Sequence, residues 1–440
     1  MKFNKWTVAL AALGVVSFAS AAKAEEKASP IMTALSSTTI SGYVDTSAQW
    51  NPGTGHANLP PYKFNSASKA DGFNLDVIQL TVSKPLDESD WAAGYRADLW
   101  FGPDANSLGT TSWGANPPSD FAIRQAYVAL RAPVGTGLDF KMGVFDSIIG
   151  YESIESGNDP NYTRSYGHSM EPQTHTGLLA SYRFCDAFSA SAGVANTVSS
   201  SINSRAQLGS TGVPSGPFAG AWQSLYNYIN DNGGNTSEFA GTRSQAESYK
   251  TYMGSMALTA PDNMGFLTGS TLYAGIVNGY NNSVWGTGLG ADQTSYYVGG
   301  TLATPVTGLR LGAAFDYVNY QDMSRQTSFG NVELNPYGLA LAGYLSYQAT
   351  EKLSFHGRLE YTEEKFGLKI DGQEPPDSHK AKIVALTGTV QYDLWKNVIS
   401  RMEVRWDHSA NGNEMFGGSV PGQPDRINAV MLAANIIYKF

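Results

Sequence analysis

Hydrophobic and polar residues alternate along much of this chain with a period of two. Between residues 398 and 408, Met402, Val404 and Trp406 share one face of an extended chain, and charged residues share the other. The charged residues are Arg401, Glu403, Arg405 and Asp407. An apolar outer face with a polar inner face is the reverse of a soluble core, because one side meets lipid and the other meets water. The pattern therefore predicts β-strands that cross a membrane.

Sixteen segments along the chain are predicted strands. They are 38–50, 73–83, 91–101, 121–132, 138–146, 174–185, 187–197, 247–260, 267–279, 294–304, 308–319, 337–349, 352–363, 382–394, 398–408 and 427–440. We expect an all-β fold, a transmembrane antiparallel up-and-down β-barrel of about 16 strands, within a range of about 14 to 18. Barrels of about eight strands fill with side chains, whereas those of about 16 to 18 leave an aqueous lumen. The strand number therefore favours a pore.

The connections between these segments alternate in length. The long ones are 51–72, 102–120, 147–173, 198–246, 280–293, 320–336, 364–381 and 409–426. Short connections lie between them, of which the Cys185–Asp186 turn is the tightest. This alternation is typical of a barrel with long extracellular loops and short periplasmic turns, and it disfavours a secreted Greek-key sandwich. Both chain ends are then expected in the periplasm.

The last predicted strand ends on an aromatic residue. Alternate residues from Val430 onward form one face, which finishes with Tyr438 and Phe440. Bacterial outer-membrane barrels close with such a strand and offer it to the barrel-assembly machinery, with the aromatic rings at the lipid interface. We therefore predict that Tyr438 and Phe440 form the barrel-assembly signal, and that the protein lies in the lipid of the cell outer membrane.

The first 24 residues indicate a cleavable signal peptide for export. Lys2 and Lys5 precede an apolar segment from Trp6 to Ser20, and Ala22-Lys23-Ala24 is a small-x-small cleavage site. The apolar segment is shorter than the roughly 20 residues that a membrane-spanning helix needs. We expect residues 25–37 to form a periplasmic lead-in and residues 38–440 to form the barrel, with no second domain.

Composition excludes several other classes of protein. The net charge of −9 becomes −12 when Lys2, Lys5 and Lys23 leave with the signal peptide, so nucleic acid is not an expected partner. The single cysteine, Cys185, excludes an intrachain disulfide framework. No cofactor or metal is implied, because Asp159-Pro160-Asn161 offers too few oxygen ligands for a hard cation.

Three short strings resemble the OmpL-like family of β-barrel porins. They are Ile123-Arg-Gln-Ala-Tyr-Val128, Asn161-Tyr-Thr-Arg-Ser-Tyr-Gly167 and Glu171-Pro-Gln-Thr-His-Thr-Gly177. With the signal peptide and the aromatic end, the resemblance extends over essentially the whole mature chain. It implies a porin through which small hydrophilic solutes and ions diffuse passively, and it names no solute and no site residues. Known 16-stranded porins are commonly trimers, which leaves a homotrimer open.

The third long connection, 147–173, is the candidate pore constriction, because an inward-folded loop at this position recurs in the porins that the chain resembles. Its charged residues are Glu152, Glu155, Asp159 and Glu171 against Arg164, and those of inward parity on the wall include Arg96, Lys141, Arg358 and Arg401. Carboxylates facing arginines across a narrow gap set a transverse field, and an acidic loop predicts a weak cation preference. Two alternatives stay open: an outward surface loop, and wall charges that pair merely to satisfy a polar interior.

Two other functions remain as alternatives to a channel. A structural or adhesive barrel plugged by its own loops is favoured by 198–246, where Phe218, Trp222, Leu225 and Ile229 have helical spacing, although a short surface helix is the simpler interpretation. A barrel-embedded hydrolase is least favoured, because the candidate histidines lie in no nucleophile or metal motif. Those candidates are His168-Ser169, His175 and Asp407-His408. The Gly286–Gly290 segment lacks the strand and helix of a nucleotide site.

Overall fold

The computed structural model describes residues 37–53, 55–108, 110, 119–206, 246, 248–282, 290–321, 323–327, 330–365, 367–370, 372–373 and 380–440. The predicted signal peptide and almost all of the lead-in lie outside the described residues. The same holds for the four apolar residues with helical spacing in 198–246 and for residues 286–289. The predictions for these segments stay predictions.

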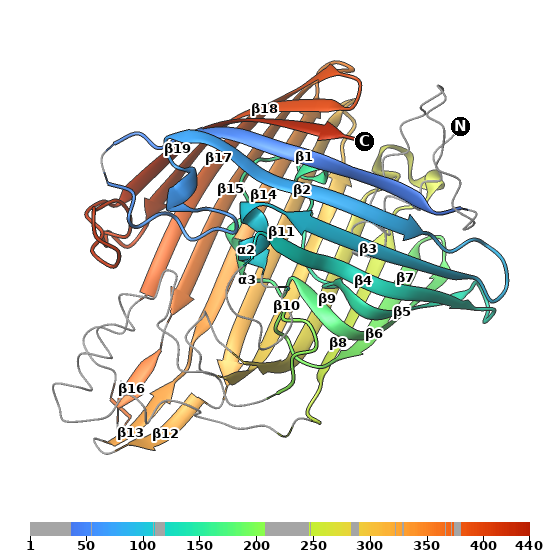
Figure 1. Ribbon diagram of the computed structural model, residues 1–440, viewed down its shortest axis with the longest axis horizontal. Helices are drawn as coiled ribbons and strands as arrows, with labels where there is room; N and C mark the ends of the chain where they lie inside the picture. The colour runs from blue at the N-terminus through green and yellow to red at the C-terminus, as the bar shows by residue number, and fades with distance from the viewer. Residues whose placement is uncertain are drawn as a thin grey trace.

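Sixteen antiparallel strands form one closed barrel, in which the order around the ring follows the chain and the last strand pairs with the first (Figure 1). The strands are β1 (Thr39–Trp50), β2 (Gly72–Lys84), β3 (Ala93–Phe101), β4 (Phe121–Ala132), β5 (Leu138–Asp146), β6 (Thr174–Cys185), β7 (Phe188–Ala195), β8 (Thr251–Thr259), β9 (Thr271–Asn281), β10 (Ala291–Ala303), β11 (Leu309–Gln321), β14 (Tyr337–Gln348), β15 (Leu353–Lys365), β17 (Lys380–Trp395), β18 (Val398–Ser409) and β19 (Asn428–Lys439). The predicted fold class is confirmed, and no strand end differs from its predicted position by more than four residues.

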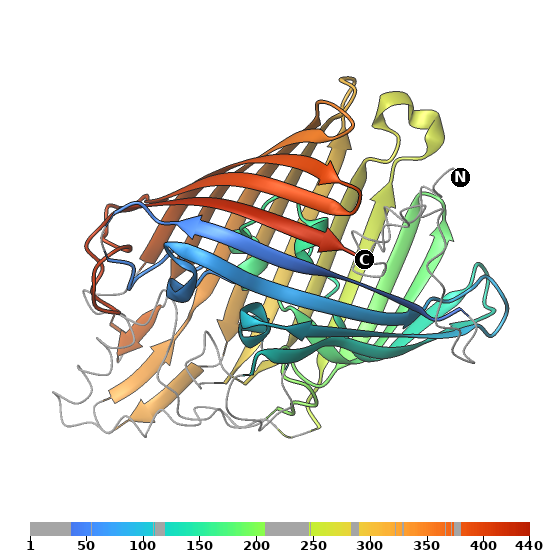
Figure 2. The ribbon, with the colours of Figure 1, turned by 45° about the horizontal axis from the view of Figure 1, so that its top comes forward.

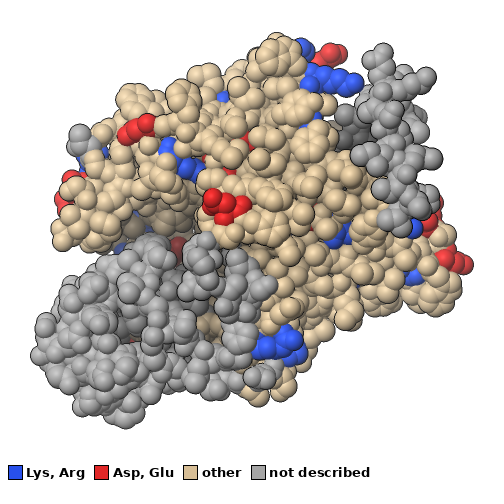
Figure 3. Space-filling view, in the orientation of Figure 1, with Lys and Arg blue, Asp and Glu red and all other residues tan. Residues whose placement is uncertain are grey.

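The two faces of the wall differ in chemistry, as the alternation predicts. On β15, Leu359 is 58% exposed on the outside, whereas its neighbour Arg358 is 1% exposed on the inside. Leucine, valine and aromatic side chains line the outer surface of successive strands. The wall that faces the viewer in Figure 3 is accordingly mostly uncharged. A closed ring leaves no strand edge unpaired, so its backbone polar groups are satisfied within the lipid.

The start of β1 and the end of β19 lie on the side of the short turns. Tyr43 of β1 pairs with Lys439 of β19, and the backbone N–H of Lys439 donates to the carbonyl of Asn397 in the turn between β17 and β18. Figure 2 shows the end of β19 beside β1. The long connections therefore leave the opposite end, which is extracellular if the short turns are periplasmic.

Several short elements lie in the long connections and were not predicted. A small sheet of β12 (Met323–Thr327), β13 (Gly330–Leu334) and β16 (Leu368–Ile370) extends beyond the barrel rim. Two short helices, α2 (Pro103–Leu108) and α3 (Tyr166–Met170), belong to the second and third long connections. Within the described parts of the chain, no helix is long and apolar enough to cross a membrane.

Candidate functional site

Residues 147–173, called the lumen loop below, connect β5 to β6 and lie inside the ring of strands (Figure 1 and Figure 2). Ile148 and Ile149 are buried in an apolar cluster with inward side chains of β6 to β11. Tyr151 stacks on Tyr344 of β14, with the ring centroids 4.0 Å apart. Burial of these apolar side chains holds the first part of the loop against the inner wall.

Glu152 ties the lumen loop to β15. Its Oε1 lies 2.9 Å from Nη1 of Arg358 and accepts a hydrogen bond from it. Arg358 also donates to Oε2 of Glu360 at 2.7 Å and to the carbonyl of Thr163 at 2.8 Å. The guanidinium therefore binds two segments of the loop and one wall carboxylate at once, and all of these charged side chains are almost completely buried.

Glu155 makes the equivalent contact on the opposite wall. Its Oε1 accepts hydrogen bonds from Arg96 of β3 at 3.0 Å and from Arg124 of β4 at 2.8 Å. Arg124 also pairs with Asp98 at 2.9 Å and with Asp146 at 2.8 Å. Charge-assisted hydrogen bonds of this kind are stronger than those between neutral groups. Because these side chains are buried, removing any one of them would leave its partners as uncompensated charges.

Arg124 was missed by the sequence analysis because of a β-bulge. Asp98 of β3 pairs with Gln125, and the next residue, Leu99, pairs with Ile123, so Arg124 is an extra residue on β4. Both Arg124 and Gln125 are consequently buried on the lumen side. Strict alternation assigns two consecutive residues to opposite faces, whereas a bulge changes the side to which one of them points.

The middle of the lumen loop is held mainly through its backbone. Arg401 of β18 donates from Nη2 to the carbonyls of Ser156 at 2.9 Å and Asp159 at 2.6 Å. Glu403, two residues along the same strand, accepts hydrogen bonds from the backbone N–H groups of Tyr162 at 2.7 Å and Thr163 at 3.0 Å. Asp159 pairs with Arg164 inside the loop, with Oδ2 3.2 Å from Nη1.

The loop ends with α3, which packs against β11, β14 and β15. The Ser165 side chain caps this helix by accepting from the backbone N–H of His168 at 3.1 Å. The hydroxyl of Tyr166 donates to Asp407 at 2.8 Å, and its backbone N–H donates to Glu360 at 2.7 Å. The lumen loop thus contacts inward groups on both sides of the barrel.

Seven of the eight predicted constriction residues converge on these contacts. They are Glu152, Glu155, Asp159, Arg164, Arg96, Arg358 and Arg401. The eighth, Lys141 of β5, lies on the wall toward the short turns, with Nζ 4.8 Å above the ring of Tyr127. The carboxylates and guanidinium groups touch directly, whereas the sequence analysis expected them to face each other across a gap. The role of these residues in a constriction stays a prediction.

Two carboxyl groups of the lumen loop have raised pKa values. Burial, with the nearby carboxylate of Glu152, raises the pKa of Asp159 to about 7. Burial and the adjacent Asp316 carboxyl hold the pKa of Glu171 well above its usual range. The stability that each contributes to the docked loop is present below its ordinary pKa and is lost as pH rises through the raised value.

The pKa of His168 is shifted in the opposite direction to those of the two carboxyl groups. Burial and nearby Arg164 hold its pKa well below its usual range, so the docked loop favours the neutral ring. Its contribution is therefore present above about pH 6.5, the usual pKa of histidine, and is lost as pH falls through the lowered value. As pH rises through about 7, Asp159 loses its proton, and docking of the lumen loop weakens.

The candidate catalytic histidines make no nucleophile–base–acid set in the described chain. His175 has Nε2 3.3 Å from the hydroxyl of Ser147, and His408 has Nδ1 2.9 Å from the amide oxygen of Asn428. Nδ1 of His168 lies 3.7 Å from a carboxylate oxygen of Glu171. Among the described residues, no group of three or more His, Cys, Asp or Glu side chains is placed to hold a metal ion.

Comparison with known proteins identifies the family. Residues 37–440 match the protein family described as "Putative beta-barrel porin-2, OmpL-like". The chain belongs to this porin family. The resemblance found in the sequence is thereby confirmed, and membership of a porin family indicates an outer-membrane protein. A search of curated proteins found no match.

Solved structures of outer-membrane barrels have the same fold. The outer-membrane channel DcaP of Acinetobacter baumannii is 12% identical, with a TM-score of 0.53 over 92% of this chain and 97% of that one. An anion-selective porin from Comamonas acidovorans is 12% identical, with a TM-score of 0.50 over 92% of this chain and 99% of that one. OprB of Pseudomonas putida is 11% identical, with a TM-score of 0.50 over 92% and 94%. At these identities the likeness extends to the fold.

Proposed function

We propose that this porin forms a channel for passive diffusion of small hydrophilic solutes and ions across the outer membrane, without catalysis. The observation that carries the proposal is a polar inner wall of sixteen strands with a long loop held inside it. A wall of that size can enclose an aqueous lumen, and an inward loop sets the size and charge of solutes that pass. The lumen loop is the proposed constriction.

We also propose a weak cation preference. Acidic groups slightly outnumber basic groups among the charged side chains where loop and wall meet. The acidic ones include Glu152, Glu155, Asp159, Glu171, Asp98, Asp146, Glu360, Glu403 and Asp407, and the basic ones include Arg96, Arg124, Arg164, Arg358, Arg401, Arg405 and Lys439. The preference is weak because this excess is small and because Asp159 and Glu171 have raised pKa values.

Single-channel recording of the purified protein in planar bilayers tests both proposals. Conductance in salt that is reduced by small sugars, with the reduction lost as the sugars become too large to enter, supports a diffusion channel. The double substitution Glu152→Gln and Glu155→Gln should shift the reversal potential in a salt gradient toward anions, because two arginine sites lose their counter-charge. Glu351→Gln combined with Glu414→Gln, both in exposed connections, is the charge-matched control. An unchanged reversal potential and conductance in the double variant would remove the lumen loop from the constriction.

The second candidate is a structural or adhesive barrel plugged by its own loops. It is favoured by the near-complete burial of Arg358, Arg401 and Arg405, which an open water-filled lumen would leave accessible. A plugged barrel predicts no conductance in wild-type protein, and conductance that appears only after Arg358→Met, because this substitution removes contacts that hold the loop. Conductance in wild-type protein favours the channel.

The aromatic residues at the end of the chain bear on how the barrel is assembled. Tyr438 lies on the outer face of β19 and Phe440 directly follows this strand, and both side chains are about half exposed. We propose that they present the signal recognised by the barrel-assembly machinery. A homotrimer stays a prediction, which the mass of the protein in mild detergent tests.

A further inference from the structure

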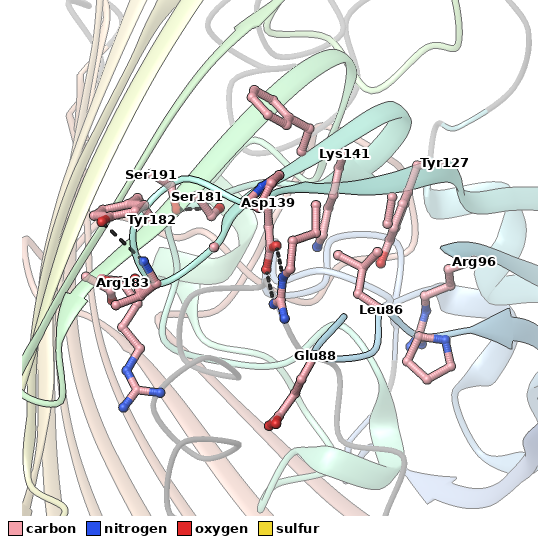
Figure 4. A pocket seen from close by; sticks show the side chains of 18 of the residues that line it. Leu86, Glu88, Arg96, Tyr127, Asp139, Lys141, Ser181, Tyr182, Arg183 and Ser191 are labelled. Atoms are coloured by element: carbon pink, nitrogen blue, oxygen red, sulfur yellow. Dashed lines mark hydrogen bonds and ion pairs between the residues drawn. The ribbon is translucent and has the colours of Figure 1, made fainter. Parts of the chain in front are cut away.

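A cavity of about 760 Å³, called the short-turn cavity below, opens among the short turns of the barrel (Figure 4). Inward residues of β3 to β7 form its wall, and Arg96 of β3 lines it beside Tyr127 of β4. The same arginine donates a hydrogen bond to Glu155 of the lumen loop at 3.0 Å. The short-turn cavity therefore reaches the lumen loop at the contact that Glu155 makes with the wall.

A second cavity, of about 20 Å³ and called the inner cavity below, adjoins the next residue of the lumen loop. Ser156 lines it, together with Asp45 of β1 and with Lys63 and Asn65 of the first long connection. A polar cavity of this size holds about one water molecule. Its lining includes a long connection, so it lies toward the opposite end of the barrel from the short-turn cavity. Glu155 thus stands between the two cavities.

Water reaches the contact made by Glu155 more readily than the contact made by Glu152. In the cluster around Glu155, the side chains of Arg96 and Asp146 are 13% and 19% exposed. In the contact with β15, the side chains of Arg358 and Glu152 are 0% and 1% exposed. An aqueous path for ions needs hydrated polar groups along its length, so these exposures favour a path at Glu155.

The lumen loop is held more closely against the other walls. Ile148 and Ile149 pack in the apolar cluster with β6 to β11, a surface that disfavours ions. Arg401 and Glu403 of β18 bind backbone groups of the loop, so the chain itself lies against that wall. Glu155 reaches β3 and β4 through the end of its side chain. Rotation of a side chain is fast compared with movement of a loop.

We propose that ions and small solutes cross the lumen loop at Glu155, along the wall formed by β1 to β4, and that the Glu155 carboxylate sets the charge selectivity of the channel. The inference rests on the proposed channel function and gives it a path and a specificity-determining residue. Rotation of Glu155 away from Arg96 joins the short-turn cavity to the inner cavity. Glu152 anchors the loop to β15 and does not face the path.

The substitutions Glu155→Gln and Glu152→Gln, made separately, test the assignment, because each keeps the side-chain volume and removes one charge. Glu155→Gln alone should give the full shift in reversal potential toward anions that the double variant gives, since a carboxylate beside the path attracts cations at short range. Glu152→Gln is the matched control and should keep the wild-type reversal potential. Equal shifts in the two single variants, or a shift with Glu152→Gln alone, overturn the assignment while leaving the channel intact.

Block by a thiol reagent tests the path independently. Three serine-to-cysteine variants are made in a Cys185→Ser background, which removes the exposed native thiol. They are Ser191→Cys in the short-turn cavity, Ser156→Cys in the inner cavity and Ser346→Cys on the lumen side of β14, outside both cavities. A cationic methanethiosulfonate added on the short-turn side should abolish most of the current of the first two variants and leave that of the third unchanged.

Mass spectrometry establishes that each thiol has reacted, and heat-modifiability establishes that each variant has folded. Block of Ser346→Cys as strong as block of Ser156→Cys overturns the path, and so does full current in both cavity variants after the reagent. Neither result touches the channel itself. A wild-type protein that does not conduct overturns the proposed channel, and the path falls with it.

Discussion

Replacing Arg358 by methionine tests whether ion pairs hold the lumen loop inside the barrel. Methionine keeps most of the side-chain volume and removes the guanidinium. Glu152 then loses its cationic partner, and the carbonyls of Thr163 and Arg164 lose a donor. Glu360 keeps a weaker partner in Arg405, whose Nη1 lies 3.6 Å from its Oε2. The main consequence is therefore an unpaired carboxylate at Glu152.

The size of the effect follows from burial. The side chains of Arg358 and Glu152 are 0% and 1% exposed, so removing one leaves the other as a buried charge. Breaking such a pair from one side costs about 3–5 kcal/mol. The lumen loop can avoid part of this cost by leaving the wall and carrying Glu152 into water. We therefore expect Arg358→Met to release the loop, with a loss of barrel stability smaller than the full pair cost.

The assay combines urea unfolding in lipid vesicles with single-channel recording. Arg358→Met should raise the conductance and admit larger sugars than wild type. Adding Glu152→Gln removes the orphaned charge, so the double variant should recover about 0.5–3 kcal/mol relative to additive single effects. Arg310→Met, which removes an exposed arginine from β11, is the matched control. The reasoning is refuted if Arg358→Met and Arg310→Met have the same stability, conductance and sugar cut-off.

Three further predictions concern the wall, the seam and pH. Leu359→Arg places a charge on the lipid face near mid-strand and should destabilise the barrel by about 2–4 kcal/mol in vesicle unfolding, whereas Ser189→Arg, on the lumen side, should assemble normally. If both substitutions were tolerated equally, the lipid and lumen faces of these strands would be misassigned. Deleting Phe440 should lower the amount of heat-modifiable barrel in the outer membrane while leaving the conductance of folded molecules unchanged; undiminished barrel levels contradict the assembly role. Conductance of wild type should rise as pH increases through about 7, because Asp159 loses its proton and the loop undocks, and Asp159→Asn should flatten this rise. A rise of the same size in the variant would exclude Asp159 as its source.

The barrel itself could be predicted because the membrane imposes a strict rule on every strand. Lipid on one side and water on the other force alternation, so the outward Met402 and the inward Glu403 were assigned to the correct faces from the sequence. The same rule fails where the backbone departs from regular pairing. The bulge at Arg124 brings a buried arginine into the site that no periodicity would indicate.

The charged residues of the site were predictable, whereas their pairing was not. Glu152 and Glu155 could be identified from their position in the third long connection, and Arg358 from the inward face that it takes on its strand. Their partners lie far apart in the chain, as with Glu403 and the N–H groups of Tyr162 and Thr163, more than 200 residues away. Such contacts depend on the path of the loop through the lumen, which local sequence does not encode. The short sheet of β12, β13 and β16 escaped notice because strands of three to five residues are too short for alternation to be distinctive.

The ring is closed by the pairing of β1 with β19, the first and last strands of the barrel. The amide of Asn435 donates to Asp45, a contact between residues 390 positions apart, whereas the other strand pairs join neighbouring strands of the ring in chain order. Local hairpins can therefore form first, and one remote contact converts the open sheet into a ring. The entropy of joining two distant ends grows only with the logarithm of their separation, by about 0.6 kcal/mol for each doubling. Insertions of tens of residues in the extracellular loops should consequently leave this last step almost unaffected, so the outer surface of the protein is free to vary in length while the ring stays the same.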